Sequence, residues 1–569
     1  MKWTIRFISL LISLALCLLS RAWAEQLQED FRSPKTIVFS ATMGGASHVK
    51  WVLSILNELA ERGHHTIFLT KNDHKKFAKD YPKVNVELMD PQAIQTEEDT
   101  RFPMHEDILL LFKVLMKKTA RVYGKDYLAY RESFEKLHPD VVICDYGHVA
   151  CMDAADTANL PFIATFILAF TEGAIILFFL DFCTDAFLGN LDSSAPYINA
   201  DMLVQQEDTT LHQSFGTRFY NKFIVKFAFR KQNMAEIRRV RHLKAELGVK
   251  DSDADIPRRT RDSLKIMNSF YGIEPARPMG PLVELVGPIL TRTYDSLTEQ
   301  LQQFLDTHPR VAYIAFGQHA VPTYADSTLL LTALFENIEQ GTLDGFLWAG
   351  PSDGFPSSVT TLSGKTYLIA DLFTSNQTVT SKNALAVQWA PQQAVLHHPS
   401  VIVFVSHGGL GSLFEALFAR KRLVIFPFFG DQLRNARKLD RDGVAVRLTR
   451  QASQAEATQA IRKVVLDEDG SIQANVERYK AMVQIHSKHG SLRGADLVEE
   501  VLFTNINGKL PHRYEVARQM SFIKAHNLDL YFVLGLLIFM PALLIWRISQ
   551  RMLAKIKRRR LEKKLSKIE

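Results

Sequence analysis

The sequence predicts an α/β protein with two Rossmann-like, doubly wound domains that face each other across a cleft, followed by one C-terminal transmembrane helix. Short apolar runs alternate with helical patterns in both halves of the 569-residue chain, which is typical of parallel strands joined by crossover helices. Residues 269–290 contain four prolines and three glycines without a helical period, which indicates a linker between two domains. Residues 528–548 form an apolar run that is long enough to cross a bilayer as a helix of ~20 residues.

The candidate strands are runs of five to seven residues rich in Val, Ile and Phe, as strands covered on both faces require. In the first half they are residues 36–41, 65–70, 84–89, 140–145 and 161–166, and in the second half 311–317, 345–350, 384–390, 401–406, 423–427 and 443–448. Ligands of doubly wound sheets bind beyond the carboxyl ends of the strands. Two such edges that face each other would form the cleft.

We therefore divide the chain into five parts by residue number. They are a signal peptide (1–24), an N-terminal domain (25–285), a C-terminal domain (286–525), a transmembrane helix (526–548) and a basic cytoplasmic tail (549–569).

The first of these parts has the pattern of a secretory signal. Lys2 and Arg6 are followed by an apolar run to Leu19, and Ala22-Trp23-Ala24 matches an A-x-A cleavage site. A retained N-terminal anchor is the alternative, although the apolar run is short for a bilayer.

The basic charge of the chain lies in its tail. From Arg547 onward, ten Lys and Arg stand against two Glu, a net of +8, whereas the whole chain carries +7. A basic run beside a spanning helix marks the cytoplasmic side, so we expect a single-pass protein with a luminal body rather than a nucleic-acid partner. Lys563, Lys564 and Lys567 loosely resemble a dilysine retrieval signal, with only Lys567 at the usual position, and we expect the endoplasmic reticulum membrane.

After the signal peptide, the only cysteines are Cys144, Cys151 and Cys183. Three thiols do not make a disulfide framework, and we expect small buried apolar side chains instead. The single sequon at Asn376 fits a surface loop in the secretory lumen, although single sequons also arise by chance.

The stretch VIVFVSHGGLGSLFEALF, residues 401–418, leads a buried strand into a helix through three glycines. Gly408, Gly409 and Gly411 have no Cβ, so a ligand can approach the backbone there. The first turn of the following helix leaves N–H groups unpaired and carries a partial positive charge, which suits a diphosphate. His407 and Ser412 add side-chain donors, and Glu415 can accept from two sugar hydroxyls; loop glycines can also be plain turns.

The flanking residues extend this pattern. Trp389 offers a flat face for a base, Gln392 offers an amide, and Asp431 and Gln432 suit hydroxyl recognition at the same sheet edge. The run W-x-P-Q-x(5)-H-P … H-G-G-x(2)-S-x(2)-E … P-x-x-x-D-Q resembles the nucleotide-sugar signature of the UDP-glycosyltransferases, a family of small-molecule glucosyl- and glucuronosyltransferases. The EPARP-x-GP-x(5)-VGPI linker and the APYI segment near residue 196 support the resemblance, which covers the chain from about residue 36 to its end.

The resemblance implies two facing Rossmann-like domains, the GT-B arrangement, with an N-terminal domain for the acceptor and a C-terminal domain for the UDP-sugar. Trp389 is similar to the uracil-stacking tryptophan, and Gln392 to the glutamine beside the nucleoside. Glu415 is similar to the ribose-binding glutamate. His407, Gly408, Gly409 and Ser412 resemble the diphosphate contacts, and Asp431 and Gln432 the pair that holds the donor sugar.

His48 and Asp145 are the candidate catalytic residues. We expect a helix from about Val49 to Arg62, which places His48 at its start, beside two glycines and beyond the first strand. A neutral imidazole there can act as a general base, and it needs an acid to orient it. Asp145 ends a strand of the same sheet, and the family resemblance identifies both residues; a capping or packing role is the alternative. We expect His64 to be structural.

The mechanism that the resemblance implies is an inverting transfer. His48 would take the proton of an acceptor hydroxyl, and the oxygen would attack the anomeric carbon opposite UDP. The helix start at residues 408–412 would stabilise the leaving diphosphate. No metal-ligand spacing is visible, so we expect no cofactor, with the UDP-sugar as co-substrate.

The chain departs from the family pattern at three places. The family usually has Asn at the position of Gly411, a basic residue at the position of Asp442, and a Gly-Ser pair within the loop that here contains Gln318 and His319. In relatives that use UDP-glucuronate, the first two positions are associated with the carboxylate, which Asp442 would repel. We therefore expect a neutral hexose, most simply glucose, with UDP-glucuronate as the alternative; the third difference is either a pair of phosphate donors or a variable loop.

The acceptor is less defined. The apolar segments 107–118 and 171–189 are either buried core or an apolar entrance near the membrane, and a lipophilic alcohol such as a sterol, phenol or sphingoid lipid suits a tethered site. A non-catalytic UDP-sugar-binding membrane protein and a transferase that builds polysaccharide or protein glycans remain as alternatives. The oligomeric state, including a homo-oligomer, stays open.

Overall fold

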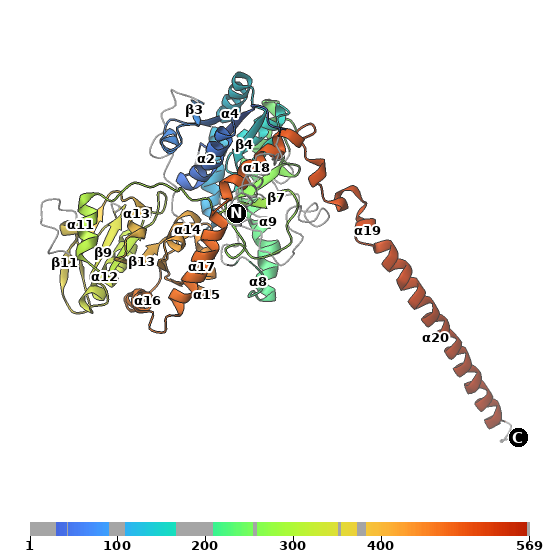
Figure 1. Ribbon diagram of the computed structural model, residues 1–569. Helices are drawn as coiled ribbons and strands as arrows, with labels where there is room; N and C mark the ends of the chain where they lie inside the picture. Colours follow the sequence, from blue (N-terminus) through green and yellow to red (C-terminus); the bar gives the residue numbers. More distant parts are fainter. Residues whose placement is uncertain are drawn as a thin grey trace, which may run out of the picture.

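The computed structural model describes residues 30–42, 44–89, 108–166, 207, 209–253, 259–350, 354–372 and 383–565. Two α/β domains lie side by side, and a long helix leads away from them (Figure 1). The signal sequence, the sequon at Asn376, Cys183, the APYI segment and the apolar segment 171–189 lie outside the described residues.

The first domain contains a seven-stranded parallel sheet in the order β3-β2-β1-β4-β5-β6-β7. Its strands are β1 (Thr36–Ser40), β2 (His65–Thr70), β3 (Asn85–Leu88), β4 (Val141–Asp145), β5 (Phe162–Phe166), β6 (Leu264–Met267) and β7 (Val283–Leu285). The five strands predicted in this half are confirmed to within two residues, whereas β6 and β7 were not predicted. The predicted linker therefore contributes a strand, β7, to the first sheet.

Alternate residues of β1 enter different cores because successive side chains of a strand point to opposite faces. Ile37 and Phe39 pack with α2 (Ala46–Glu61). Val38 packs on the other face with tyrosines of α4 (Ile108–Leu137) and with α5 (Val149–Thr157). The first domain is thus a sheet between two helical layers.

The second domain contains a six-stranded parallel sheet in the order β12-β9-β8-β13-β14-β15. Its strands are β8 (Val311–Ala315), β9 (Gly345–Ala349), β12 (Ala384–Val387), β13 (Val401–Ser406), β14 (Arg422–Ile425) and β15 (Ala445–Arg447), with a small β10–β11 hairpin (Ser358–Thr360, Thr366–Leu368) beside them. Its helices are α11 (Glu299–Thr307), α12 (Tyr324–Glu339), α13 (Gln392–His397), α14 (Leu410–Phe418), α15 (Gln432–Arg441) and α16 (Gln454–Leu466). All six strands predicted in this half are confirmed, although several are shorter than expected.

Strand order reverses direction in both sheets between two central strands, β1 and β4 in the first and β8 and β13 in the second. Such a reversal leaves a crevice beyond the carboxyl ends of the strands, where ligands of this fold class bind. The predicted catalytic residues follow β1 and end β4, and the glycine-rich stretch follows β13.

The chain returns to the first domain near its end. Helix α17 (Ser471–Ser487) packs on α14 in the second domain, whereas α18 (Gly490–Thr504) packs on α2 in the first. Gly494 makes this approach close, since a Cβ there would lie 2.4 Å from Cδ1 of Ile55. The expected C-terminal domain, residues 286–525, therefore includes residues that pack on the first domain, because α18 and Leu510 belong to the core of the first domain.

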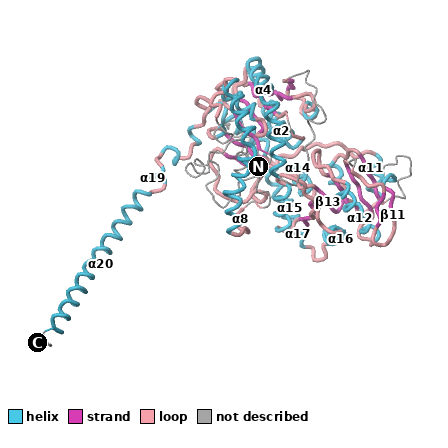
Figure 2. Tube along the Cα trace, turned by 180° about the vertical axis from the view of Figure 1, so that it is seen from behind, coloured by secondary structure: helices cyan, strands magenta, loops and turns pink. Residues whose placement is uncertain are grey.

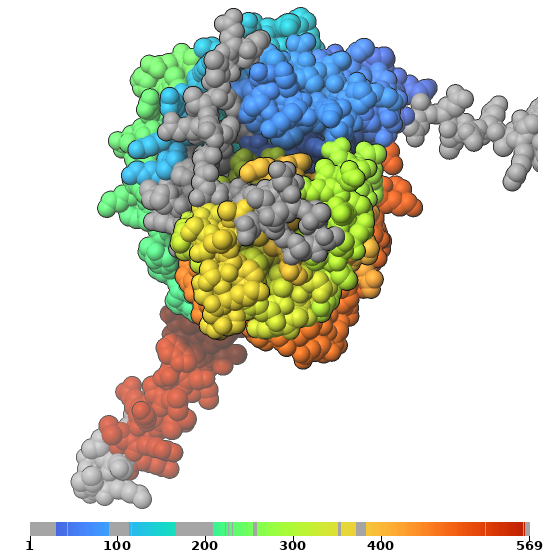
Figure 3. All heavy atoms as spheres, turned by 90° about the vertical axis from the view of Figure 1, so that its left-hand side faces the viewer, coloured from blue at the N-terminus to red at the C-terminus, as the bar shows by residue number. Residues whose placement is uncertain are grey.

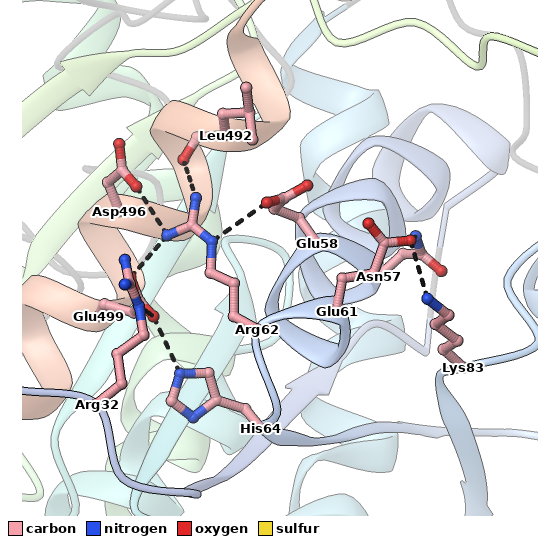
Figure 4. Close-up of polar contacts among 10 residues, drawn as sticks. All are labelled: Arg32, Asn57, Glu58, Glu61, Arg62, His64, Lys83, Leu492, Asp496 and Glu499. Atoms are coloured by element: carbon pink, nitrogen blue, oxygen red, sulfur yellow. Dashed lines mark hydrogen bonds and ion pairs between the residues drawn. The ribbon is translucent and has the colours of Figure 1, made fainter. Parts of the chain in front are cut away.

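Glu499 of α18 holds the returning helix in place (Figure 4). Its carboxylate accepts from Nε of Arg32 at 2.7 Å, from Nη1 of Arg62 at 2.6 Å and from Nε2 of His64 at 3.1 Å. Because His64 and Glu499 are both buried, these bonds satisfy a charge that would otherwise be costly to bury. His64 has the structural role predicted for it.

Helix α20 (Leu528–Leu565) extends away from both domains in the two opposite views (Figures 1 and 2). Residues 528–561 form a helix that is long and apolar enough to cross a membrane. The most apolar stretch of this helix, 18 residues long, is not buried against the rest of the protein. This is the one such helix among the described residues, and it coincides with the predicted span.

Candidate functional site

The first domain places His48 beside Asp145. Helix α2 begins at Ala46, three residues earlier than predicted, so His48 lies in its first turn. The Nδ1 atom of His48 is 3.0 Å from Oδ2 of Asp145 at the end of β4. Gly44 leaves room for the ring, because a Cβ at this position would lie 2.4 Å from Cδ2 of His48.

Asp145 is fully buried and hydrogen-bonded on both oxygens. Its Oδ1 accepts from the backbone N–H of Gly147 at 3.0 Å and from Nδ1 of His148 at 3.3 Å. Burial alone would raise the pKa of Asp145, but the charge of His48 and the hydrogen bonds from His148 and His48 hold that pKa well below its usual range. The ionised carboxylate can only accept, so Nδ1 of His48 donates and Nε2 is left to accept a proton.

His148 was not predicted, and its tautomer follows from its partners. The backbone N–H of Thr42 donates to Nε2 of His148 at 2.7 Å. Nε2 is therefore an acceptor, and Nδ1 carries the hydrogen that points to Asp145. His148 thus fixes the carboxylate that orients His48.

Tyr146 was also not predicted from the sequence. Its ring lies parallel to that of His48, with centroids 5.8 Å apart and planes 17° apart, and it stacks in turn on Phe166. Burial and the negative charges of Asp145 and Asp431 raise the pKa of Tyr146 well above its ordinary value. The Tyr146 ring thus forms an aromatic wall beside the imidazole of His48.

The second domain forms a glycine loop at the start of α14. Gly408 has φ +89°, and a Cβ there would lie 2.7 Å from Cγ2 of Ile425, so only glycine fits. Gly409 is the N-cap residue without a side-chain cap, and α14 begins at Leu410, two residues before the predicted start. The N–H groups of its first turn have no intrahelical partners, which is the feature by which helix starts bind anions.

His407 lies beneath this loop. Burial and the positive charge of His319 lower the pKa of His407 to about 4. Its Nδ1 atom is buried and has no hydrogen-bond partner among the described residues. A neutral imidazole that is partly buried in this way can donate to or accept from a ligand in the loop.

A network of amides holds Glu415 and Ser412. Nε2 of Gln392 donates to Oε2 of Glu415 at 2.6 Å and to Oγ of Ser412 at 3.1 Å, and Nε2 of Gln393 donates to Oε1 of Glu415 at 3.2 Å. Burial raises the pKa of Glu415. Trp389 stands just before α13 with 72% of its surface exposed, so a flat face is open to a base.

Asp431 and Gln432 differ in which side-chain atoms remain available to bind a ligand. Burial raises the pKa of Asp431 to about 6, and Oδ2 accepts from Nδ2 of Asn435 at 2.9 Å. The same Asn435 amide donates to the carbonyl of Gly408 at 2.9 Å, which ties α15 to the glycine loop. Gln432 is buried, and its Oε1 accepts from the backbone N–H of Phe428 at 2.9 Å, so only its amide NH₂ is left for a ligand.

The two halves of the site meet across the gap between the domains, which Figure 3 shows as a recess between the blue residues of the first domain and the green to orange residues of the second. Oε1 of Gln318, beyond β8, accepts from the backbone N–H of Ala46 at 3.4 Å. A Cβ on Gly411 would lie 3.8 Å from that of Ser47. Burial and the positive charges of His48, His74 and Lys118 lower the pKa of His319 to about 4. The glycine loop thus lies beside the start of α2.

Sequence comparison decides the family. The family described as "UDP-glucoronosyl and UDP-glucosyl transferase" matches residues 37–556. The chain belongs to the UDP-glycosyltransferase family. UDP-glycosyltransferase FPY2 of Fusarium mangiferae is 30% identical over 499 residues, which cover 82% of this chain and 83% of that protein. UDP-glycosyltransferase stmC of Aspergillus ustus is 25% identical over 533 residues, 88% and 95% of the two chains.

Two further comparisons are more limited. UDP-glucuronosyltransferase 3A1 of Mus musculus is 25% identical over 277 residues, 48% of each chain. The solved structure of the glycotransferase of kitacinnamycin has the same fold, with a TM-score of 0.54 and 16% identity over 82% of this chain and 98% of that one. The protein is therefore a transferase with the GT-B fold, and its family implies a UDP-sugar donor and an acceptor substrate, which favours an enzyme over the non-catalytic alternative.

In this UDP-glycosyltransferase, the position of Asp442 does not support the expectation that it repels the carboxylate of UDP-glucuronate. Asp442 caps the C-terminus of α15, whereas Asp431 lies at the N-terminus of this ten-residue helix, about 16 Å away at 1.5 Å per residue. Its carboxylate accepts from Nζ of Lys438 at 2.9 Å and from the hydroxyl of Tyr479. Repulsion between Asp442 and a uronate is therefore not a reason to prefer a neutral sugar.

The expectation of unpaired cysteines is wrong for two of the three. Cys144 and Cys151 form a disulfide across a separation of seven residues. Both side chains are fully buried, as predicted, but the turn between β4 and α5 brings them together. Three cysteines cannot all pair with one another in disulfides, but two of them can, as they do here.

Proposed function

We propose that this transferase moves a hexose, most simply glucose, from a UDP-sugar to a hydroxyl of a small lipophilic acceptor with inversion, and that His48 is the general base. The observation that carries the proposal is the His48–Asp145 pair, which lies beside the glycine loop of α14 across the domain gap. A base and a diphosphate site on opposite sides of one gap suit attack from one face and departure from the other.

The second domain would hold the donor. Trp389 would stack on the uracil, Gln392 would lie beside the nucleoside, and Glu415 would accept from the ribose hydroxyls after releasing part of its amide network. Asp431 and the amide of Gln432 would bind sugar hydroxyls. His407, Ser412 and the N–H groups beyond Gly408 and Gly409 would bind the diphosphate.

Catalysis would use the two halves in turn. Nε2 of His48 takes the hydroxyl proton while Asp145 stabilises the imidazolium through Nδ1–H. The acceptor oxygen forms a bond to the anomeric carbon as the bond to the diphosphate breaks, so an α-linked donor gives a β-glycoside. The first turn of α14 stabilises the charge on the departing UDP. The proposal includes no metal ion or cofactor, because these groups supply the base and the phosphate site.

Asp431 does not decide between the donors. With a pKa of about 6 this carboxylate is mostly ionised at pH 7, and it lies where the donor sugar would bind. The Asp-Gln pair belongs to the signature that the family's glucosyl- and glucuronosyltransferases share, so the preference for glucose rests on Gly411, which stands where the family usually has Asn. UDP-glucuronate remains the alternative donor.

The full chain in nanodiscs tests the proposal with labelled UDP-glucose or UDP-glucuronate and a panel of sterols, phenols and sphingoid lipids. We expect label in a lipid product from UDP-glucose, with a β-anomeric coupling in its proton spectrum. Transfer from UDP-glucuronate alone would overturn the donor, an α-glycoside would overturn inversion, and transfer only to polysaccharide or protein would overturn the acceptor class.

We also propose a single-pass protein of the endoplasmic reticulum membrane with a cleaved signal peptide, a luminal body and a cytoplasmic tail. The exposed apolar α20 and the basic residues after it support this orientation. Protease treatment of sealed microsomes should remove only the tail. Digestion of the body under the same conditions would contradict the orientation.

A further inference from the structure

Four phenylalanines form an exposed ridge outside the site. Phe215, Phe219, Phe223 and Phe227 recur every fourth residue along α8 (Phe215–Phe219), the π-helical turn η2 (Tyr220–Val225) and the start of α9 (Lys226–Glu246). Their exposed fractions are 75%, 49%, 45% and 64%. We call these four residues, with Tyr220 and Ile224 at 55% and 44%, the aromatic ridge.

Neighbouring rings of the ridge lie close to one another. Phe219 lies between Phe215 and Phe223, with ring centroids 6.3 and 5.1 Å away. The opposite face of the same helical segment is anchored, because Phe229 and Val225 are buried. The fold therefore presents the ridge outward, although exposing so many large apolar side chains together is unfavourable in water.

The sequence of the same segment is basic. Arg218, Lys222, Lys226 and Arg230, which we call the basic row, also recur every fourth residue, and the stretch 215–231 contains no Asp or Glu. Apolar aromatic residues beside a row of Lys and Arg on one helix are typical of segments that lie in the membrane interface, with rings among the acyl chains and cations at the phosphates. An acidic protein partner would use the basic row but would not account for the aromatic ridge.

The position of the segment agrees with a bilayer. In the two opposite views α8 lies at the lower end of the first domain, and α20 also leads downward from the body (Figures 1 and 2). Only residues 505–527 separate α18, which is packed on the first domain, from α20. The membrane that α20 enters is therefore within short reach of the domain that carries the ridge.

We propose that the aromatic ridge and its basic row lie in the interface of the bilayer that α20 spans, as a second membrane contact of the body. This inference rests on the proposed membrane span and not on the proposed reaction. Together the two contacts orient the first domain on the lipid surface, and they keep the site next to a source of lipophilic acceptor.

The test measures membrane binding by the aromatic ridge after the body has been cut from the membrane span α20. A specific protease site is inserted between Glu515 and Val516 of the full chain, which is reconstituted into vesicles of phosphatidylcholine with phosphatidylserine and then cleaved. We expect the released body to float with the vesicles. The variant Phe215→Ser, Phe219→Ser, Phe223→Ser should leave the vesicles, with a membrane-bound to free ratio at least about tenfold lower.

The matched control removes exposed apolar side chains elsewhere. Leu362→Ser, Leu368→Ser and Ile485→Ser change residues that are 80%, 60% and 70% exposed, and the body should stay bound. High salt should weaken binding of the parent body through the basic row.

Three outcomes would overturn the proposal. They are release of the parent body from the vesicles, equal retention of the ridge variant, and a change of oligomeric state in the ridge variant without release, which would make the ridge an interface between copies. Sugar transfer to a water-soluble acceptor, measured on both variants, shows that they are folded. Loss of transfer in the parent chain would count against the proposed function and not against the ridge.

Discussion

The Nδ1 atom of His48 lies 3.0 Å from Oδ2 of Asp145, although 97 residues separate them in the chain. Neighbouring strands bring them together, because β1 and β4 pair and end at the same sheet edge. The buried carboxylate also accepts from His148 and Gly147, so its position is fixed from several sides.

Asp145→Asn should therefore lower kcat by roughly 10²- to 10⁴-fold. An amide cannot stabilise the imidazolium and presents NH₂ to one of its two histidine partners. UDP affinity, measured by calorimetry, should stay within a factor of about two, since Asp145 lies in the other domain. Asp140→Asn, at the opposite end of β4 and paired with Lys35, is the control, and an equal loss of kcat in it would contradict the assigned role.

Trp389→Ala should weaken UDP binding by roughly 5- to 150-fold, because a base–aromatic stack contributes about 1–3 kcal/mol. With 72% of the side chain exposed, the free energy of unfolding should change little. Titration with UDP and thermal denaturation check the two statements. Unchanged affinity would remove Trp389 from the donor site, and Trp389→Phe should retain most of the binding.

Protonation of His407 should favour UDP binding at acidic pH, relative to a His407→Gln variant. His407 has a pKa of about 4 in the free protein, and a bound diphosphate would favour its protonated form, so binding takes up protons. The ratio of the parent affinity to that of His407→Gln should rise by up to about tenfold per pH unit as the pH falls, because titration of the UDP phosphate near pH 6 affects both proteins alike. Calorimetry in buffers of different ionisation enthalpy measures the uptake, and His407→Gln should abolish most of it; an equal uptake in the variant would contradict the contact.

His407 should also make the free energy of unfolding depend on pH. Because the pKa of His407 is lower in the folded protein than in the unfolded chain, the unfolded chain binds more protons between pH 6.5 and about 4. The free energy of unfolding should therefore fall as the pH decreases through this window, and His407→Gln should be less sensitive to pH. Denaturant unfolding of both proteins at pH 7 and pH 5 checks this.

Glu499→Gln should lower the free energy of unfolding by about 3 kcal/mol, because it leaves two arginines and a histidine without their shared carboxylate. Burial alone would raise the pKa of Glu499, but the hydrogen bonds from its three partners lower it. This stabilisation is present at neutral pH and is lost as the pH falls below about 4. Glu61→Gln, an exposed partner of Lys83 in the same view (Figure 4), should change stability by less than about 1 kcal/mol, and similar effects of the two variants would contradict this account.

The strands were predictable where apolar residues ran without interruption. Strands β1 and β13 have such runs, and both were found to within one residue. Strand β6 was missed because Lys265 interrupts it; the structure buries this side chain and lets Nζ donate to the carbonyls of Thr260 and Ser263. Strand β7 was hidden by the prolines around it.

The positions of the candidate site residues in the fold were predictable where a residue type and its spacing form a recognisable pattern. His48, Trp389 and Asp431 follow from strand ends and from the family signature. Tyr146 and Asn435 act through contacts between loops that are far apart in sequence, which no local pattern records. The mistaken use of Asp442 has the same origin, because its position at the far end of α15 is a matter of helix geometry.

The most direct test of the account compares His48→Ala with the parent chain in single-turnover sugar transfer and in UDP titration. The account predicts that transfer falls by at least about 10²-fold while UDP affinity is unchanged, since the imidazole belongs to the acceptor side of the gap. Transfer at the parent rate, or a loss of UDP affinity as large as the loss of transfer, would contradict the role of His48 as the base.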